Sequence, residues 1–287
     1  MAIHETILVG TDGSASATAA VRWAAVEADR RGAALRIVHA FDESWATVPA
    51  RPGLGLVETA HDGAAVMTTD ARLTANATAP GVSVRADTVV GDAPTALLAA
   101  AVSADLVVLG NRGRGGFTSL VLGSTSLRVA AHAPCPVAVV RGRTMALDGP
   151  VVVGSDGSHG GESTLRTGFE AAAARHTGLL VVRAFQLPAL PATPGMPVVA
   201  ASERECETGE RNAVAALLAP WRDKFPTVRV DTLVSCGDAG RVLVGTSHTA
   251  QLLVVGSRGL GTFVGTVLGS VTTQLLHHAD CPVLIAR

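Results

Sequence analysis

The chain has 287 residues, a formal net charge of -1, 48% hydrophobic residues and 16% charged residues. Its length suits one large domain or two of ordinary size, and its apolar content supports a buried core and excludes a disordered chain. The near-neutral charge argues against a nucleic-acid surface, and the lack of a membrane-length apolar run or a secretory signal predicts a cytoplasmic protein without a membrane partner.

Short β-branched segments alternate with alanine-rich helical segments along the first half of the sequence. Strands are indicated by β-branched runs bounded by glycine, and helices by apolar residues three and four apart. The predicted strands are Ile7–Gly10, Leu35–Ala40, Val82–Val90, Leu106–Leu109 and Val137–Val140. The predicted helices are Ala15–Arg31, Ala64–Ala79, Pro94–Ser103 and Ser124–His132. The proline-bearing segments Asp42–Gly63 and Gln186–Val199 are predicted to be irregular surface loops.

The second half of the sequence repeats the first in the same order. Ile7–Ser14 matches Val151–Ser158, and later motifs of the first half recur in turn. Self-similarity over this length predicts a tandem duplication of a complete domain rather than a solenoid. The expected domains are residues 1–142 and 150–287, with a short Gly- and Pro-bearing seam between them.

Alternating strands and helices predict an α/β fold in which each domain is a doubly wound, mostly parallel sheet with helices on both faces. Ligands bind such sheets at the carboxyl ends of the strands, where the strand order reverses. Asp12 follows the first strand and Gly110 follows the fourth. If these two strands are neighbours, Asp12 and the Gly110 loop face one crevice.

A glycine motif occurs once in each half: Gly-x-x-Gly, nine residues, then Gly-Ser. It comprises Gly110, Gly113 and Gly123–Ser124 in the first half, and Gly256, Gly259 and Gly269–Ser270 in the second. A strand, a glycine loop and a helix N-terminus together favour phosphate, because backbone N–H groups and the helix dipole point at the anion. Arg112 and Arg258 add a cation to each loop. Hydroxyl groups that could cap the helix or bind phosphate follow, at Ser124, Thr125, Ser126, Ser270, Thr272 and Thr273.

Several other chemistries lack their residues. A Walker A loop needs a lysine after glycine, and the only lysine is Lys224. The turn after the first strand does not have the Gly-x-Gly-x-x-Gly pattern of dinucleotide-binding folds. No acid/base pair is evident, so efficient catalysis is not indicated and no metal site is predicted. Cys135 and Cys281, in matching positions, are interpreted as small buried residues.

At these motifs the chain resembles the universal stress protein family, of the tandem, ATP-binding type. Both glycine motifs match that family's signature without a gap, and the early aspartates in Gly-Thr-Asp-Gly-Ser and Gly-Ser-Asp-Gly-Ser also fit. The resemblance implies a five-stranded parallel sheet of order 3-2-1-4-5 in each domain. It also implies that the domains pair through their last strands, Pro136–Arg141 and Pro282–Arg287, as an internal pseudo-dimer, and it allows a homodimer of whole chains.

The resemblance further implies ATP as ligand, accompanied by Mg²⁺. Asp12, Ala40 and Gly110 would contact the adenosine part in the first half, and Asp156, Ala184 and Gly256 in the second. The phosphates would be held by Arg112, Gly113, Gly123, Ser124 and Thr125 in the first half, and by Arg258, Gly259, Gly269, Ser270 and Val271 in the second. Val271 in place of Thr125 removes a hydroxyl but keeps a backbone N–H.

Three functions fit these residues. The first is an ATP-binding stress-response regulator, in which occupancy of two sites controls conformation or the binding of a regulatory protein partner. The second is a slow Mg²⁺-dependent ATPase or nucleotidyl-transfer enzyme, which the missing base and lysine disfavour. The third is an interaction scaffold without nucleotide, which the intact signature in both halves disfavours.

Overall fold

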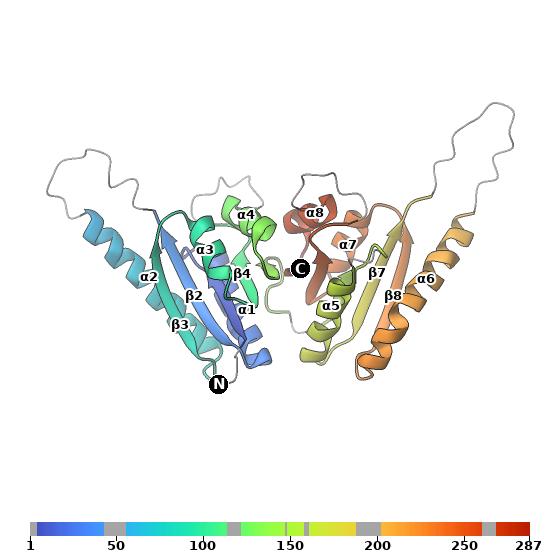
Figure 1. The fold of residues 1–287 in the computed structure, drawn as a ribbon, viewed down its shortest axis with the longest axis horizontal. Coiled ribbons are helices and arrows are strands. Elements are labelled where there is room, and N and C mark those ends of the chain that lie inside the picture. The colour runs from blue at the N-terminus through green and yellow to red at the C-terminus, as the bar shows by residue number, and fades with distance from the viewer. Residues whose placement is uncertain are drawn as a thin grey trace, which may run out of the picture.

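The computed structural model describes residues 5–42, 56–113, 122–146, 148–157, 161–187, 202–259 and 268–287. In these ranges, every helix is too short or too polar to cross a membrane. Figure 1 shows the two halves of the chain side by side, each with its strands between two sets of helices.

The ten strands of the described ranges form one sheet of order β3-β2-β1-β4-β5-β10-β9-β6-β7-β8. Each half therefore has the predicted order 3-2-1-4-5. The halves join where β5 and β10 pair antiparallel, with Leu284 opposite Ala138, so the expected pairing through the last strands is confirmed. The strands are β1 Thr6–Gly10, β2 Ala34–Phe41, β3 Val84–Val90, β4 Leu106–Gly110, β5 Val137–Val140, β6 Val151–Gly154, β7 Leu179–Phe185, β8 Val230–Cys236, β9 Leu252–Gly256 and β10 Val283–Ala286.

Helices cover both faces of this sheet. Ile7 and Val9 of β1 face one apolar core and Leu8 faces the other, because successive strand residues point to opposite faces. The first core is covered by α1 Ala15–Arg31, α2 Leu56–Thr78, α5 Glu162–Ala174 and α6 Glu203–Lys224. The second is covered by α3 Ala93–Ala101, α4 Ser124–His132, α7 Ala239–Ser247 and α8 Ser270–His278.

The predicted boundaries agree with the structure at α1, α4 and β5. The irregular loop predicted for Asp42–Gly63 is wrong for its last residues, Leu56–Gly63, which are helical. The structure begins α2 at Leu56. The prolines that suggested a loop are Pro49 and Pro52, and nothing after them prevents a helix. Residues 43–55 lie outside the described ranges, as do residues 188–201 of the second predicted loop.

Two arginines at matching places cross the seam between the halves. Arg141, after β5, donates from Nη1 to the carbonyls of Leu275 (3.0 Å) and Leu276 (2.8 Å), at the C-terminal end of α8. Arg287, after β10, donates to the carbonyl of Ala130 in α4. A cation at a helix C-terminus satisfies free carbonyls and complements the dipole. Each half thus caps a helix of the other.

A buried carboxylate joins the halves on the opposite face. Glu27 of α1 lies 2.6 Å from Arg175, which follows α5, and 2.7 Å from Arg31. Arg31 and Arg175 occupy matching positions of the two halves, so one carboxylate serves two equivalent guanidinium groups. Burial alone would raise the pKa of Glu27, but the charges of Arg175 and Arg31 outweigh it and lower that pKa.

Candidate functional site

The turn after β1 and the loop after β4 meet at one edge of the sheet. β1 and β4 are parallel neighbours, so both end at the same edge. A Cβ built on Gly113 would lie 2.6 Å from Oδ2 of Asp12, and one on Gly259 would lie 3.1 Å from Oδ2 of Asp156. The expected juxtaposition of aspartate and glycine loop is confirmed in both halves. Glycine keeps the space that a side chain would take from the carboxylate.

Serines of α1 hold the first-half loop in place. The Ser14 backbone N–H donates to Oδ1 of Asp12 (3.0 Å), and the Ser14 hydroxyl caps α1. The Ser16 hydroxyl donates to Oδ1 of Asn111 (2.8 Å) and accepts from the Arg112 N–H (3.2 Å). A Cβ on Gly110 would lie 2.5 Å from the Ser16 hydroxyl oxygen. Gly110 therefore allows the close approach of α1 on which these bonds depend.

The two ends of the glycine loop are tied together by a backbone hydrogen bond. The Gly123 N–H donates to the Asn111 carbonyl (2.8 Å), and the Gly269 N–H donates to the Ser257 carbonyl (2.9 Å). Residues 114–121 and 260–267 between these ends lie outside the described ranges. Gly123 and Gly269 are thereby fixed at the start of α4 and α8.

The helices that begin at the motif have glycine N-caps. The N-caps Gly123 and Gly269 supply no side-chain hydrogen bond to the first turn of α4 and α8. Side chains do cap α1, α3, α6 and α7, at Ser14, Asp92, Ser202 and Asp238. The first-turn N–H groups of α4 and α8 therefore have no capping oxygen from their N-cap residue, and free N–H groups at a helix start can bind an anion.

The hydroxyl groups near these helix starts divide into two kinds. Ser126 is buried and donates to the Gly110 carbonyl (2.7 Å), and Thr272 donates to the Gly256 carbonyl (2.8 Å). Their hydroxyls fasten the helix to the strand end, contrary to the interpretation of Ser126 and Thr272 as caps or phosphate ligands. Ser124 and Ser270 are exposed in the first turn, whereas Thr125 and Val271 are half-buried.

Positive charge gathers beside each loop. Arg112 and Arg258 are exposed at their loops. Burial lowers the pKa of Arg141, and the nearby charge of Arg112 lowers it further. Burial lowers the pKa of Arg287 likewise, with a further lowering from Arg258. Each loop arginine therefore interacts electrostatically with the arginine that caps a helix of the opposite half, while Asp280 offsets part of the positive charge at Arg141.

The second strand of each half carries a half-buried alanine, Ala40 on β2 and Ala184 on β7. The residue before it differs between the halves. Nδ1 of His39 is 2.8 Å from the Thr11 carbonyl. Arg183 instead donates to Glu210 (2.7 Å) and packs against the Gly157 turn, with Nη1 3.4 Å from a Cβ built there. The two sites are therefore similar in backbone and different in polar surroundings.

Sequence reasoning missed the serines and arginines that support the site. Ser16 holds the loop after β4, and Arg141 and Arg287 cross the seam. One signal was available: Arg141 and Arg287 end the two repeats at matching positions. The exchange of His39 for Arg183 is likewise visible in the aligned repeats.

Comparisons with known proteins point to one family over nearly the whole chain. A family model described as "Universal stress protein family" matches residues 4–141 and 149–287. Universal stress protein Rv2005c of Mycobacterium tuberculosis is 33% identical over 289 residues, which cover 98% of this chain and 96% of that protein. Universal stress protein Rv2623 of the same organism is 32% identical over 293 residues, which again cover 98% of this chain and 96% of that protein. The crystal structure of a universal stress protein from Archaeoglobus fulgidus has a TM-score of 0.73 at 16% identity, covering 98% of both chains, which shows the fold.

Proposed function

Because this chain belongs to the universal stress protein family, we propose that residues 1–142 and 150–287 each bind one ATP with Mg²⁺ at the glycine loop. Occupancy of the two sites then controls the conformation of the chain or its binding to a regulatory protein partner or a second copy. The observation that carries the proposal is the glycine N-cap of α4 and α8, fixed beside a glycine loop and an arginine. That arrangement suits phosphate and supplies no catalytic base.

We assign the base and ribose end of the nucleotide to the turn after β1. Asp12 and Asp156 are the carboxylate acceptors for ribose hydroxyl groups, and Ala40 and Ala184 leave room for the flat base. Gly110 and Gly256 act through spacing, since Gly110 lets α1 approach closely. The adenosine contacts proposed for the two halves are Asp12, Ala40, Gly110, Asp156, Ala184 and Gly256.

The phosphates fit the glycine loop and the first turn of the following helix. Backbone N–H groups there point toward an anion, and the exposed hydroxyls of Ser124 and Ser270 can donate to it. Mg²⁺, bound through the phosphate oxygens, would supply charge neutralisation. The phosphate contacts proposed for the two halves are Arg112, Gly113, Gly123, Ser124, Thr125, Arg258, Gly259, Gly269, Ser270 and Val271.

The experiment uses a substitution that repels phosphate without weakening the helix. Ser124→Asp places a carboxylate in the first turn of α4, where it favours the helix dipole and opposes phosphate. We expect ATP affinity at the first site to fall by at least about tenfold, which corresponds to 1.4 kcal/mol, while the melting temperature is maintained. Ser270→Asp is the matched variant for the second site, and Ser124→Ala, which removes the hydroxyl without adding a charge, should lose less affinity than Ser124→Asp.

The result also separates the other functions. Unchanged ATP binding in both aspartate variants would exclude the site, and absence of any bound nucleotide in the wild type would favour a scaffold. The protein is purified without added nucleotide, denatured and examined by mass spectrometry for released ATP or ADP. Turnover with Mg²⁺ that rises well above background and is lost in Ser124→Asp would instead show an ATPase.

A further inference from the structure

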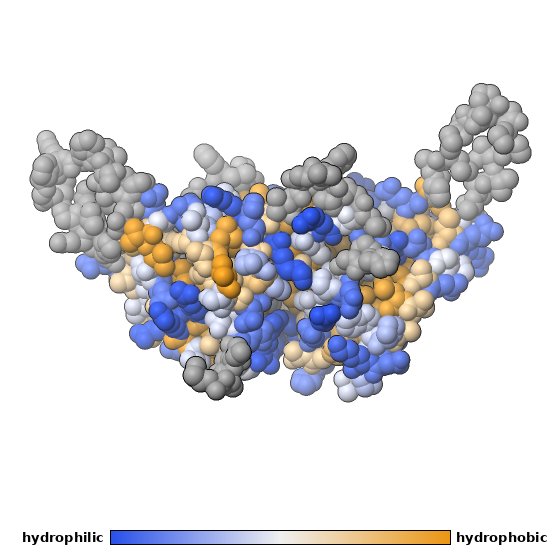
Figure 2. Space-filling view, viewed as in Figure 1, coloured by the Kyte–Doolittle hydropathy of each residue, from blue (hydrophilic) through white to orange (hydrophobic). Residues whose placement is uncertain are grey.

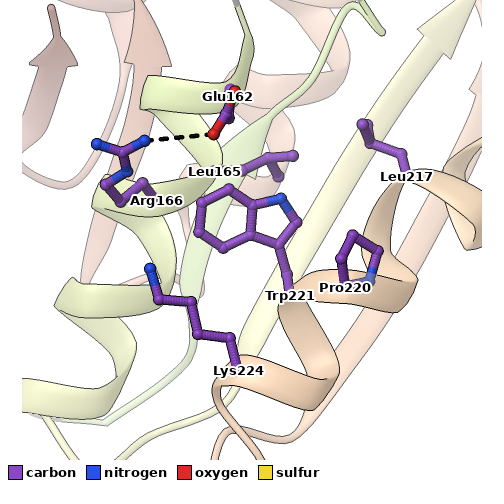
Figure 3. A pocket seen from close by; sticks show the side chains of 7 residues that line it. All are labelled: Glu162, Leu165, Arg166, Leu217, Pro220, Trp221 and Lys224. Carbon is purple, nitrogen blue, oxygen red and sulfur yellow. Dashed lines mark hydrogen bonds and ion pairs between the residues drawn. The ribbon is translucent and has the colours of Figure 1, made fainter.

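A second concave site lies between α5 and α6, in the second half of the chain. Its cavity has a volume of about 390 Å³. Leu165, Leu217 and Trp221 form the apolar part, and Arg166 and Lys224 lie on the same side of the Trp221 ring (Figure 3). The volume is within the range of pockets that hold small organic ligands, about 300–1,000 Å³.

Aromatic side chains set the spacing of the two helices that form this cavity. The Phe169 ring stacks on Trp221 at 5.6 Å and on Phe225 at 5.3 Å between centroids. The matching positions of the first half are alanines: Ala25, Ala75 and Ala79. There α1 packs closely on α2, whereas α5 lies farther from α6. Bulky rings at this contact hold the helices apart and leave a hollow over Leu217 and Trp221, with the buried Leu165 among its lining residues, since helix separation follows side-chain size.

The rim of the cavity has an excess of positive charge. Lys224 places its ammonium 5.5 Å from the Trp221 ring centroid. Arg166 pairs with Glu162 at 3.3 Å, but both side chains are more than half exposed, so this pair is worth little and leaves Arg166 able to turn to a ligand. Blue hydrophilic residues border orange apolar ones around α5 and α6 in Figure 2. Two cations and one carboxylate thus surround an apolar floor.

We propose that this cavity binds a small organic anion with a flat apolar body. The body lies on Leu165, Leu217 and the Trp221 ring, and its carboxylate or sulfonate faces Lys224 and Arg166. The site goes beyond the proposed nucleotide binding, because none of its residues belongs to the glycine loops or to the turns after β1 and β6. The ligand would contact α5 and α6, which cover the sheet face opposite the one covered by α8.

Lys224 makes the test specific, because it is the only lysine of the chain. Reductive methylation with ¹³C-formaldehyde gives one dimethyl-lysine NMR signal, which retains its charge and lies beside the Trp221 ring. The full chain is then titrated with 8-anilinonaphthalene-1-sulfonate, a flat apolar body with one sulfonate. We expect the signal to move and to saturate at one equivalent per chain, and to do so equally with Mg²⁺ and ATP present.

Two comparisons test the chemistry of the site. N-phenyl-1-naphthylamine has the same ring system without the sulfonate, and we expect it to bind about fivefold more weakly, as for loss of one partly exposed charge interaction. Leu217→Glu puts a carboxylate at the apolar edge, where we expect at least about tenfold weaker binding of the sulfonate. Leu73→Glu, on the exposed side of α2, is the matched control and should bind as the wild type does.

A stationary Lys224 signal during the titration would overturn the proposal, as would unchanged binding in Leu217→Glu. Displacement of the dye by ATP would overturn it too, because it would place the dye in a nucleotide site. Dye binding that survives while both aspartate variants of the nucleotide sites lose ATP would separate this site from the proposed function.

Discussion

The Asp12 carboxylate occupies the space that a side chain on Gly113 would need. Its Oδ2 lies 2.6 Å from the Cβ position of Gly113, and its Oδ1 accepts from the Ser14 N–H. The carboxylate is therefore fixed over the loop by a turn that is itself attached to α1. The equivalent distance from Asp156 to Gly259 is 3.1 Å, which leaves slightly more room.

We predict that Gly113→Ala impairs the first site more than Gly259→Ala impairs the second. A methyl group at residue 113 forces Asp12 to give up its contact with Ser14, whereas one at residue 259 requires a smaller shift. Affinity for ATP at the first site should fall by about tenfold, and at the second by less. Titration calorimetry on each variant checks this, and equal losses in both would contradict it.

Arg141→Ala should destabilise the pairing of the two halves. The side chain donates two hydrogen bonds to carbonyls of α8, and a charged hydrogen bond contributes about 1.5–3 kcal/mol. We expect a loss of about 2–3 kcal/mol in the free energy of unfolding, measured by urea denaturation. Arg128→Ala is the control, because its 3.4 Å pair with Asp92 is exposed and should contribute less than about 1 kcal/mol.

Glu27→Gln should be among the most destabilising single substitutions. It leaves the Arg175 guanidinium, which is 2% exposed, without its counter-charge, at an expected cost of about 3–5 kcal/mol at neutral pH. Glu5→Gln removes a more exposed partner of Arg31 and should cost less than about 1 kcal/mol. Similar losses in the two variants would contradict the role given to Glu27.

The stabilisation by Glu27 should also depend on pH. Its pKa is lowered in the folded state, so the unfolded chain takes up the proton first as the pH falls. The contribution of Glu27 to stability is complete at pH values well above 4.5, the ordinary pKa of a glutamate. It is lost as the pH falls through the lower pKa of the folded state. Unfolding curves of the wild type and of Glu27→Gln should therefore converge in acid, and a constant difference down to pH 2 would count against this account.

Thiol reactivity should divide the cysteines into two pairs. Burial raises the pKa of the Cys281 thiol to about 12 and raises that of Cys135, whereas Cys206 and Cys236 are half-buried. At pH 8 a thiol reagent such as 5,5′-dithiobis(2-nitrobenzoate) should modify Cys206 and Cys236 in the folded protein and all four after denaturation. Rapid modification of Cys281 in the folded state would show that its end of β10 opens.

The fold could be predicted from the sequence because the signals for strands and helices are local and occur in both halves. Glycine and β-branched residues marked the strands, the duplication showed two equal units, and the expected sheet order 3-2-1-4-5 followed from the family resemblance. The start of α2 was missed because Pro49 and Pro52 suggest an irregular segment, whereas Leu56–Gly63 has no proline of its own and forms the first turns of the helix.

The features that could not be predicted from the sequence depend on contacts between residues far apart in the chain. Ser126 carries the same hydroxyl whether it binds phosphate or the Gly110 carbonyl, and only the packing of α4 on β4 decides between them. The crossing of Arg141 to α8 depends on the pairing of β5 with β10. The cavity beside Trp221 depends on the distance between two helices, which helical periodicity alone does not give.

The number of ATP molecules bound per chain tests the central claim most directly. Titration calorimetry with Mg²⁺ should give two ATP molecules bound at the wild-type affinity for the wild type, one for Ser124→Asp, one for Ser270→Asp and none for the double variant, all with retained melting temperatures. A wild-type chain that binds no ATP, or a double variant that binds as the wild type does, would contradict the assignment of the two glycine loops as nucleotide sites.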